Sequence, residues 1–307
     1  MPPCVSAVES FPVRIVVVDN SGSMNSMDGN RLIRMPNGEV RSISSTRWAE
    51  LGDVIREMGE AVSALQAETH FHMLNPTTAG QYFVVAPDPS GGHVGRAGAP
   101  ADVPSLKAAL DTSPMGTTPL TEAVVLAASL IEPAADKLRA HGQQVVVVLA
   151  TDGLPNDPQS FLRALQQLQR LPVWLVVRLC TDEDAVVQYW SDLDAQLEAP
   201  LETLDDVAGE AKEIRAANPW LTYAPSLHLA RTMGPRPPAQ AVRRRRRPRR
   251  TVCAARLHTL DALRQKPRPR ARGHVPFVVC VRAAQGCVTS SSTCSTSGRC
   301  CRRSASS

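Results

Sequence analysis

Three short runs of branched apolar residues constrain the fold of this 307-residue chain more than any other feature. They span residues 13–18 (VRIVVV), 145–149 (VVVVL) and 173–179 (VWLVVRL). Such nearly uninterrupted runs are typical of strands that are buried on both faces. Because helical segments separate the strands, the pattern predicts βαβ units. We therefore expect an α/β fold with a doubly wound (Rossmann-like), mainly parallel sheet and one antiparallel edge strand.

The remaining elements follow from periodicity and turn signals. Apolar residues at spacings of three and four predict helices at 46–65, 103–110, 120–131, 183–197 and 207–216. Asp157 followed by Pro158 is typical of a helix start, here of a helix to about residue 170. Further strands are expected at 71–74 and 81–85, around a turn containing Asn75 and Pro76, and at 201–204. Asn37-Gly38 predicts a small hairpin within the polar stretch 20–45. Residues 218–233 are expected to dock on the domain through Trp220, Leu221 and Tyr223.

The charge distribution divides the chain into two parts. The 34 basic and 29 acidic residues give a net charge of +5, but 17 of the basic residues and only one acid lie after position 242. Residues 1–242 therefore carry −11 and residues 243–307 carry +16. We expect an N-terminal extension at 1–10, one α/β domain at 11–233, and a Pro-, Arg-, Ser- and Cys-rich tail at 234–307. Low aromatic content and high charge predict that this tail is disordered.

Composition also bounds the location of the protein. No stretch approaches the roughly 18–20 apolar residues of a membrane span, so no membrane partner is expected. The first residues lack the pattern of a signal peptide. Only Cys4 and Cys180 precede the tail, which is not a disulfide framework. We expect a cytoplasmic protein, with nuclear import through the basic run from Arg243 to Arg250 as an alternative.

Polar motifs stand where two of the apolar strands end. In a doubly wound sheet, ligands bind outside the carboxyl ends of the strands. The first strand leads into D-x-S-x-S, with Asp19, Ser21 and Ser23, and the VVVVL strand leads into ATDG, with Asp152. A third loop, MGTTPL, places Thr118 just ahead of a helix. These residues offer hydroxyl and carboxylate oxygens only, the ligands that hard divalent cations prefer, so we expect Mg²⁺ (or Mn²⁺) as cofactor.

The three motifs, in this order and each at the end of an element, resemble the von Willebrand factor A (vWA) domain and its metal-ion-dependent adhesion site. The resemblance covers roughly residues 11–230 and implies Asp19, Ser21, Ser23, Thr118 and Asp152 as metal ligands. Segments such as TRWAEL and LPVWLVVRLCTDED resemble a narrower group of intracellular, largely uncharacterised eukaryotic members. Two features depart from the family pattern. The loop after Ser23 is about 20 residues longer than the minimal pattern, and Thr117 stands where Gly is frequent, which makes it the alternative to Thr118.

Other polar residues have simpler interpretations. Asp28, with Gly29 and Asn30, could add a ligand for a second cation, but an ordinary turn is favoured. His70 and His72 lack partners in sequence for a zinc site, Cys180 is expected to be a small core residue, and Glu183 a first-turn acid of a helix. The Gly-rich stretch 91–98 lacks the Lys-Ser/Thr of a phosphate loop and is expected to be a flexible loop.

The leading hypothesis is a binding module rather than an enzyme. A site made mostly of hydroxyls leaves a divalent cation under-neutralised, so a protein ligand with an exposed Asp or Glu is expected to complete the coordination. The first alternative is a metal-assisted phosphohydrolase or an accessory to an ATP-driven complex. An aspartyl-phosphate enzyme would need a second acid two residues after Asp19, and Ser21 stands there. The second alternative is nucleic-acid binding through the Arg-rich tail, unless the tail is a translated non-coding or out-of-frame extension.

Overall fold

A computed structural model describes residues 10–86, 103–181, 183–197, 201–204 and 206–234. The basic tail, the Gly-rich stretch 91–98 and most of the N-terminal extension lie outside these residues. The predictions about them therefore stay predictions. Within the described part, no helix is long and apolar enough to cross a membrane.

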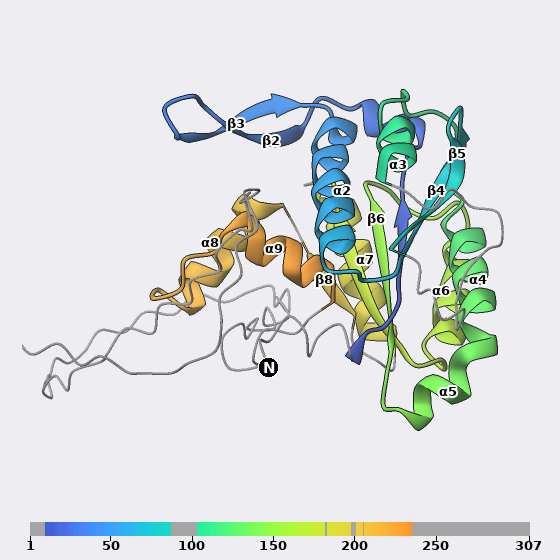
Figure 1. Ribbon diagram of the computed structural model, residues 1–307. Coiled ribbons are helices and arrows are strands. Elements are labelled where there is room, and N and C mark those ends of the chain that lie inside the picture. The colour runs from blue at the N-terminus through green and yellow to red at the C-terminus, as the bar shows by residue number, and fades with distance from the viewer. Residues whose placement is uncertain (1–9, 87–102, 182, 198–200, 205, 235–307) are drawn as a thin grey trace, which may run out of the picture. The chain divides into compact units, whose positions relative to one another are not determined.

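The centre of the molecule is a six-stranded sheet with the order β5-β4-β1-β6-β7-β8 (Figure 1). The strands are β1 (Arg14–Val18), β4 (Thr69–Thr77), β5 (Gly80–Val85), β6 (Val145–Thr151), β7 (Val173–Leu179) and β8 (Glu202–Leu204). All neighbouring pairs are parallel except β4 and β5, which are antiparallel. The α/β class, the mainly parallel sheet and its antiparallel edge strand are thus as the sequence predicted.

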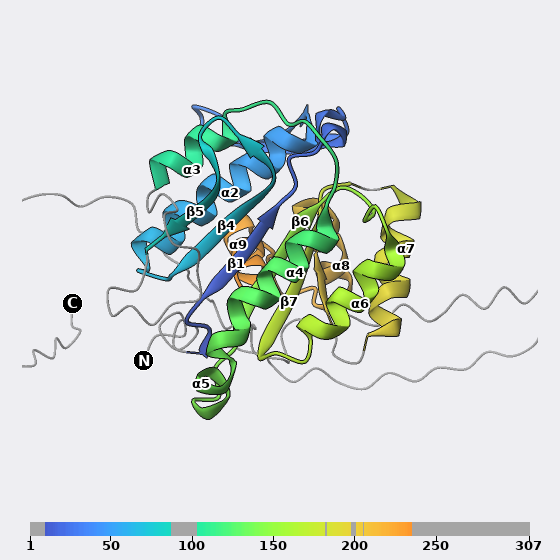
Figure 2. The same ribbon diagram turned by 90° about the vertical axis from the view of Figure 1, so that its right-hand side faces the viewer.

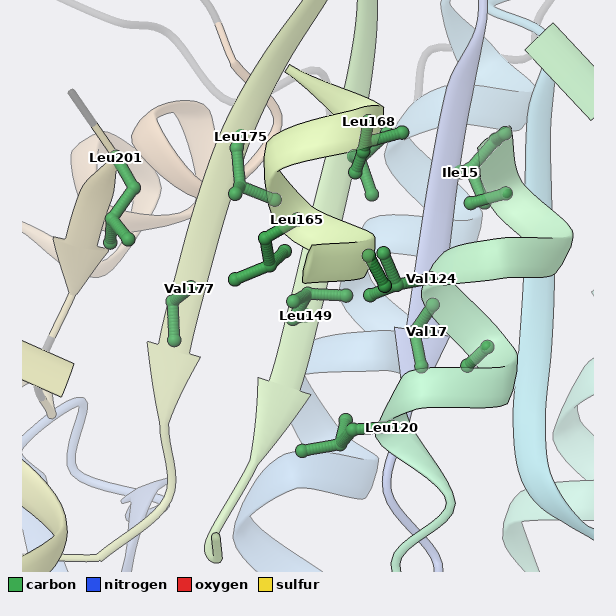
Figure 3. Close-up of a cluster of buried hydrophobic side chains, with 14 of the residues drawn as sticks. Ile15, Val17, Leu120, Val124, Leu149, Leu165, Leu168, Leu175, Val177 and Leu201 are labelled. Atoms are coloured by element: carbon green, nitrogen blue, oxygen red, sulfur yellow. The ribbon is translucent and has the colours of Figure 1, made fainter. Parts of the chain in front are cut away.

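Helices cover both faces of the sheet, because alternate residues of each strand point to opposite sides. From β1, Ile15 and Val17 join a core with α4 (Leu120–Ile131), α6 (Pro158–Leu168) and α7 (Asp184–Gln196) (Figures 2 and 3). Val16 and Val18 face α2 (Arg47–Ala64) and α3 (Val103–Leu110) on the other side. All five residues of β1 are buried, as expected for a central parallel strand.

The C-terminal part of the domain consists of α8 (Val207–Ala217) and α9 (Pro225–Thr232). The guanidinium of Arg14 at the start of β1 donates to the Met233 carbonyl, which holds the end of α9 at the sheet. Trp220 was expected to help dock this segment, but it is 65% exposed and does not. Two short helices, η2 (Glu132–Ala134) and α5 (Ala135–Ala140), were not predicted from the sequence.

The long segment between β1 and α2, which was expected to be a loop with a small hairpin, contains a short helix and two strands. A short 3₁₀ helix, η1 (Gly22–Asn25), is followed by the hairpin strands β2 (Gly29–Arg34) and β3 (Val40–Ser45). The turn of this hairpin holds Asn37 and Gly38, and Gly38 has a φ of +84°, a left-handed conformation that favours glycine. Figure 1 shows the hairpin extending away from the sheet beside the start of α2.

One turn was misplaced by the sequence analysis. Asn75 and Pro76 were expected to form the turn between two strands, but both lie within β4, which runs on to Thr77. The register of β4 with β5 is irregular between His72 and Thr77, and this irregularity accommodates the Pro, which cannot donate a ladder hydrogen bond.

Candidate metal centre

Two carboxylates lie side by side where β1 and β6 end. The strands pair in parallel register, with Val18 opposite Ala150, and the amide of Asp19 donates to the Ala150 carbonyl at 2.9 Å. The hydroxyl of Thr151 donates to Asp19 Oδ2 at 2.6 Å. Asp152 is the next residue along, and both Asp residues are almost fully buried. The register of two neighbouring strands thus places both predicted acids at one edge of the sheet.

The two predicted serines join these acids through a chain of hydrogen bonds. The amide of Ser21 donates to Asp19 Oδ1 at 2.9 Å, which turns the chain sharply after β1. The hydroxyls of Ser21 and Ser23 are 3.0 Å apart, and Ser23 Oγ donates to Asp152 Oδ1 at 2.9 Å. The buried side chain of Met24 anchors η1 in the core and so fixes the turn. Four of the five predicted ligands therefore form one oxygen cluster.

The third motif reaches the same edge through its backbone. The amide of Met115 donates to the Asn20 carbonyl at 2.8 Å, and the amide of Gly22 donates to the Gly116 carbonyl at 3.1 Å. Asn75 Nδ2 also donates to the carbonyl of Thr117 at 2.8 Å. These bonds hold the loop that carries both threonines against the D-x-S-x-S loop.

The choice between the two threonines stays a prediction. Thr117 is exposed, whereas Thr118 is half-buried and its carbonyl accepts from the Leu120 amide at the start of α4. The lower exposure of Thr118 agrees with its selection as the ligand.

The electrostatics of the cluster favour a cation. Burial raises the pKa of Asp19, and hydrogen bonds from Ser21 and Thr151 oppose the rise only in part. The negative charge of Asp152 raises it further. Two buried carboxylates with adjacent hydroxyls match the oxygen set that Mg²⁺ and Mn²⁺ prefer. Among the described residues, no group of three or more His, Cys, Asp or Glu side chains is arranged to hold a metal, so a site here depends on the hydroxyls.

One important residue of the site was missed by the sequence analysis. Arg47, at the start of α2, is buried, and its Nη1 donates to Asp152 Oδ2 at 2.9 Å. A cation in the first turn of a helix is unfavourable for the helix dipole, and this anomaly was the available signal. The sequence could not show which acid it contacts, because Asp152 is 105 residues away.

Two residues with modest expected roles are also bound to Arg47. Asp28, expected to form an ordinary turn, makes a bidentate pair with it, with Nε–Oδ1 at 2.7 Å and Nη2–Oδ2 at 2.6 Å. Glu183 was expected to be a first-turn acid of a helix. It instead occupies the N-cap position of α7 without capping it, and its Oε1 accepts from Arg47 Nη2 at 2.7 Å.

His70, His72 and Cys180 lie outside the hydrogen-bonded oxygen cluster, although the Cys180 amide donates to the Thr151 carbonyl, next to Asp152, at 3.0 Å. His70 is buried, with its Nε2 at 2.6 Å from Glu68 Oε1, and His72 is stacked on Tyr82 with ring centroids 4.4 Å apart. Cys180 is buried, and burial raises the pKa of its thiol, so it is not an activated nucleophile. All three are buried, as expected for Cys180. Glu68, two residues before His70, is an acid partner that the sequence analysis overlooked.

Solved structures with a similar fold include a TRAP protein and a thread matrix protein. The manganese-loaded TRAP protein of Plasmodium vivax has 15% identity over 64% of this chain and 69% of its own, with a TM-score of 0.39. Proximal thread matrix protein 1 from the mussel byssus has 16% identity over 64% of this chain and 42% of its own, with a TM-score of 0.33. Its form with a zinc-occupied MIDAS motif has 15% identity and a TM-score of 0.30 over 55% of this chain and 37% of its own.

This chain spans less than half the length of the mussel protein. No family model matches the sequence, and no curated protein matches it. At such low identity the likeness concerns the fold alone. The family resemblance therefore depends on the molecule itself, that is, on its strand order, its antiparallel edge strand and the D-x-S-x-S cluster at the carboxyl end of β1. On these features, the chain has the fold of a von Willebrand factor A domain.

Proposed function

We propose that this protein is a metal-dependent protein-binding module and not an enzyme. The observation that carries the proposal is the hydrogen-bonded oxygen cluster of Asp19, Ser21, Ser23 and Asp152 at the carboxyl end of the sheet. These residues, with Thr118, would hold Mg²⁺ or Mn²⁺. When bound, the cation supplies a positive point of attachment for an oxygen ligand.

The partner proposed is a protein with an exposed Asp or Glu. Two carboxylates balance a divalent charge in number, but Asp152 shares its charge with Arg47, so the cluster under-neutralises the cation. A carboxylate from outside would complete the charge balance. Ser23 is exposed while Asp19 and Asp152 are buried, so an outside ligand would approach from the side of the hydroxyls.

The loops around the oxygen cluster carry exposed side chains that are suited to a protein partner. Three large apolar side chains close in sequence to the motifs are exposed: Met27 (66%), Met115 (64%) and Leu154 (43%). Each belongs to a loop that also carries a predicted ligand or follows one. Methionine is enriched in protein interfaces, and contacts that surround a central contact exclude water from it. We propose that they contact apolar residues flanking the partner's acid.

The first test is direct metal binding. Ser23→Ala removes one exposed hydroxyl and should leave the fold intact. Titration calorimetry with Mn²⁺ is expected to show a loss of affinity of about tenfold or more in this variant. Ser26→Ala, three residues further along and also exposed, is the matched control and should bind as the wild type does. Equal affinity in the wild type and Ser23→Ala would overturn the site.

The second test concerns the partner. Immobilised wild-type protein should capture its partner in Mg²⁺ and release it in chelator, and Asp19→Ala should capture none. After identification of the partner, exchange of its contacting Asp or Glu for the amide should abolish capture. Capture by Asp19→Ala in chelator that equals capture by the wild type in Mg²⁺ would contradict the mechanism.

A further inference from the structure

We propose that Arg47 is a positioning residue of the metal centre, and that through Asp28 it couples the centre to the β2–β3 hairpin. This inference rests on the proposed function, since it concerns the same metal site. It adds the hairpin as a regulatory element that carries none of the five proposed oxygen ligands.

The first observation is that one guanidinium contacts three acids. The Arg47 side chain is only 5% exposed, and its nitrogens contact carboxylates from three separate segments. Asp28 precedes β2, Asp152 follows β6, and Glu183 precedes α7. Because the guanidinium is planar and rigid, fixing two of its edges fixes the third. Arg47 Nε and Nη2 both donate to the Asp28 carboxylate, and this orientation directs Nη1 at Asp152.

The second observation is that the two carboxylate oxygens of Asp152 have different partners. Its Oδ2 accepts from Arg47, and its Oδ1 accepts from Ser23, a proposed ligand. The guanidinium therefore determines which oxygen of Asp152 faces the hydroxyl cluster. Partners of this kind, one bond removed from a metal, orient its ligands and alter its affinity.

The third observation is that, among the described residues, the hairpin also contacts α2 through side chains other than Arg47. The amide of Asn30 donates to Glu50 Oε2 at 2.7 Å, and Arg31 forms a two-bond pair with Asp53 at 2.6 and 2.9 Å. Neither pair includes Arg47. A path of direct contacts therefore runs from the hairpin through Asp28 and Arg47 to Asp152, while the Asp53 pair holds the same hairpin without entering this path.

The contact between Asp28 and Arg47 is expected to raise the metal affinity of the site. Asp28→Asn would remove the charge that balances and orients Arg47, so the guanidinium would interact more strongly with Asp152 and compete with the cation. It would also remove one negative charge from the surroundings of the site. Both effects lower metal affinity. By thermodynamic reciprocity, metal binding must then stabilise the contact between the hairpin and Arg47.

The experiment compares Mn²⁺ affinity in the full chain for the wild type and three variants. Asp28 is half exposed, so Asp28→Asn should fold, and we expect its affinity to fall about tenfold. Asp53→Asn, which removes an equal charge from the other hairpin contact, should remain within about twofold. Arg47→Lys keeps the charge but not the planar fork, and should lose affinity as Asp28→Asn does.

A second readout separates positioning from a merely structural role. Hydrogen exchange of the hairpin amides, residues 29–45, should slow when Mn²⁺ is added to the wild type and to Asp53→Asn, but not to Asp28→Asn. If the wild type binds no divalent cation, the proposed function fails and the inference fails with it. If the wild type binds but Asp28→Asn or Arg47→Lys binds equally well, only the inference is overturned.

Discussion

Gly116 approaches the side chain of Asn75 so closely that a Cβ atom on Gly116 would lie 2.4 Å from Asn75 Oδ1. The same glycine has a φ of +92°, in the region that side chains other than hydrogen disfavour. The Asn75 side chain cannot withdraw freely, because its Nδ2 donates to the Thr117 carbonyl. This approach allows the threonine loop to lie against the D-x-S-x-S loop.

Gly116→Ala is therefore expected to weaken both the fold and the metal site. The loss of unfolding free energy should be about 2–3 kcal/mol, the sum of backbone strain and displacement of Asn75. Gly142→Ala is the matched control, because Gly142 also has a positive φ but no atom within 4 Å of the added carbon. Its cost should be roughly 1 kcal/mol. Denaturant titration measures both, and equal losses would show that the approach to Asn75 is unimportant.

Thr118→Val is expected to reduce Mn²⁺ affinity by roughly tenfold or more, because it removes the hydroxyl but preserves the shape of the side chain. Thr117→Val provides the comparison in the adjacent position and should bind normally. Titration calorimetry distinguishes them. The opposite result would assign the ligand to Thr117, the alternative that the sequence left open.

His228 is expected to make stability depend on pH. It is buried in α9, where desolvation and the charges of Arg178 and Arg231 lower its pKa to about 3. Arg178 Nη1 contacts the ring at Nε2, and Tyr223 Oη lies 2.9 Å from Nδ1. The unfolded chain binds a proton below about pH 6.5, but the folded chain does not until about pH 3. Stability is therefore full above pH 6.5 and is lost as the pH falls.

The slope that this histidine contributes should approach, at most, about 1.4 kcal/mol per pH unit between these values. His228→Gln should remove it, and the exposed His141→Gln should not. Denaturant unfolding at pH 7, 5.5 and 4 provides the measurement. A wild-type slope that persists unchanged in His228→Gln would assign the pH dependence to other groups.

The protein is not expected to hydrolyse phosphate esters. Ser21 occupies the position where an aspartyl-phosphate enzyme would carry a second acid, and its hydroxyl is paired with Ser23. An assay with a generic aryl phosphate and Mg²⁺ should show no turnover above that of an Asp19→Asn variant. Turnover by the wild type that Asp19→Asn abolishes would favour the hydrolase alternative.

Nucleic-acid affinity, if the full chain has any, is expected to belong to the basic tail. Truncation after Gly234 removes all 17 basic residues that follow position 242 and leaves an acidic domain. Binding to a mixed-sequence duplex and its steep salt dependence should disappear with the tail. Binding that survives the truncation would place the nucleic-acid site on the domain instead.

The strands and the cluster of polar residues at their ends could be predicted because their signals are local. A run such as VVVVL has few alternatives to a buried strand, and the D-x-S-x-S and ATDG motifs directly follow such strands. Parallel pairing then brings Asp19 and Asp152 to the same edge without further information. The N-cap predicted at Asp157 was equally local, and its side chain accepts the Gln159 amide as expected.

The remainder depended on contacts between distant segments. Arg47 could be recognised as unusual in its helix, but its three acids come from positions 28, 152 and 183. Pro76 was taken as a turn residue because proline usually interrupts strands. The irregular register at the sheet edge tolerates it here. Trp220 was expected to help dock residues 218–233, and only the packing of the last helices shows that it is exposed.

Because Asp19 and Asp152 are buried and Ser23 is exposed, partner capture should depend on the salt concentration in a particular way. Solvent meets uncharged Ser23 rather than the acids, on a domain whose sequence carries −11 up to position 242. Without a cation, this domain repels an acidic partner, and added salt should relieve that repulsion. With a cation in place, the local attraction is what salt would screen. Added salt should therefore weaken partner capture when the divalent ion is present, and it should not restore capture in chelator.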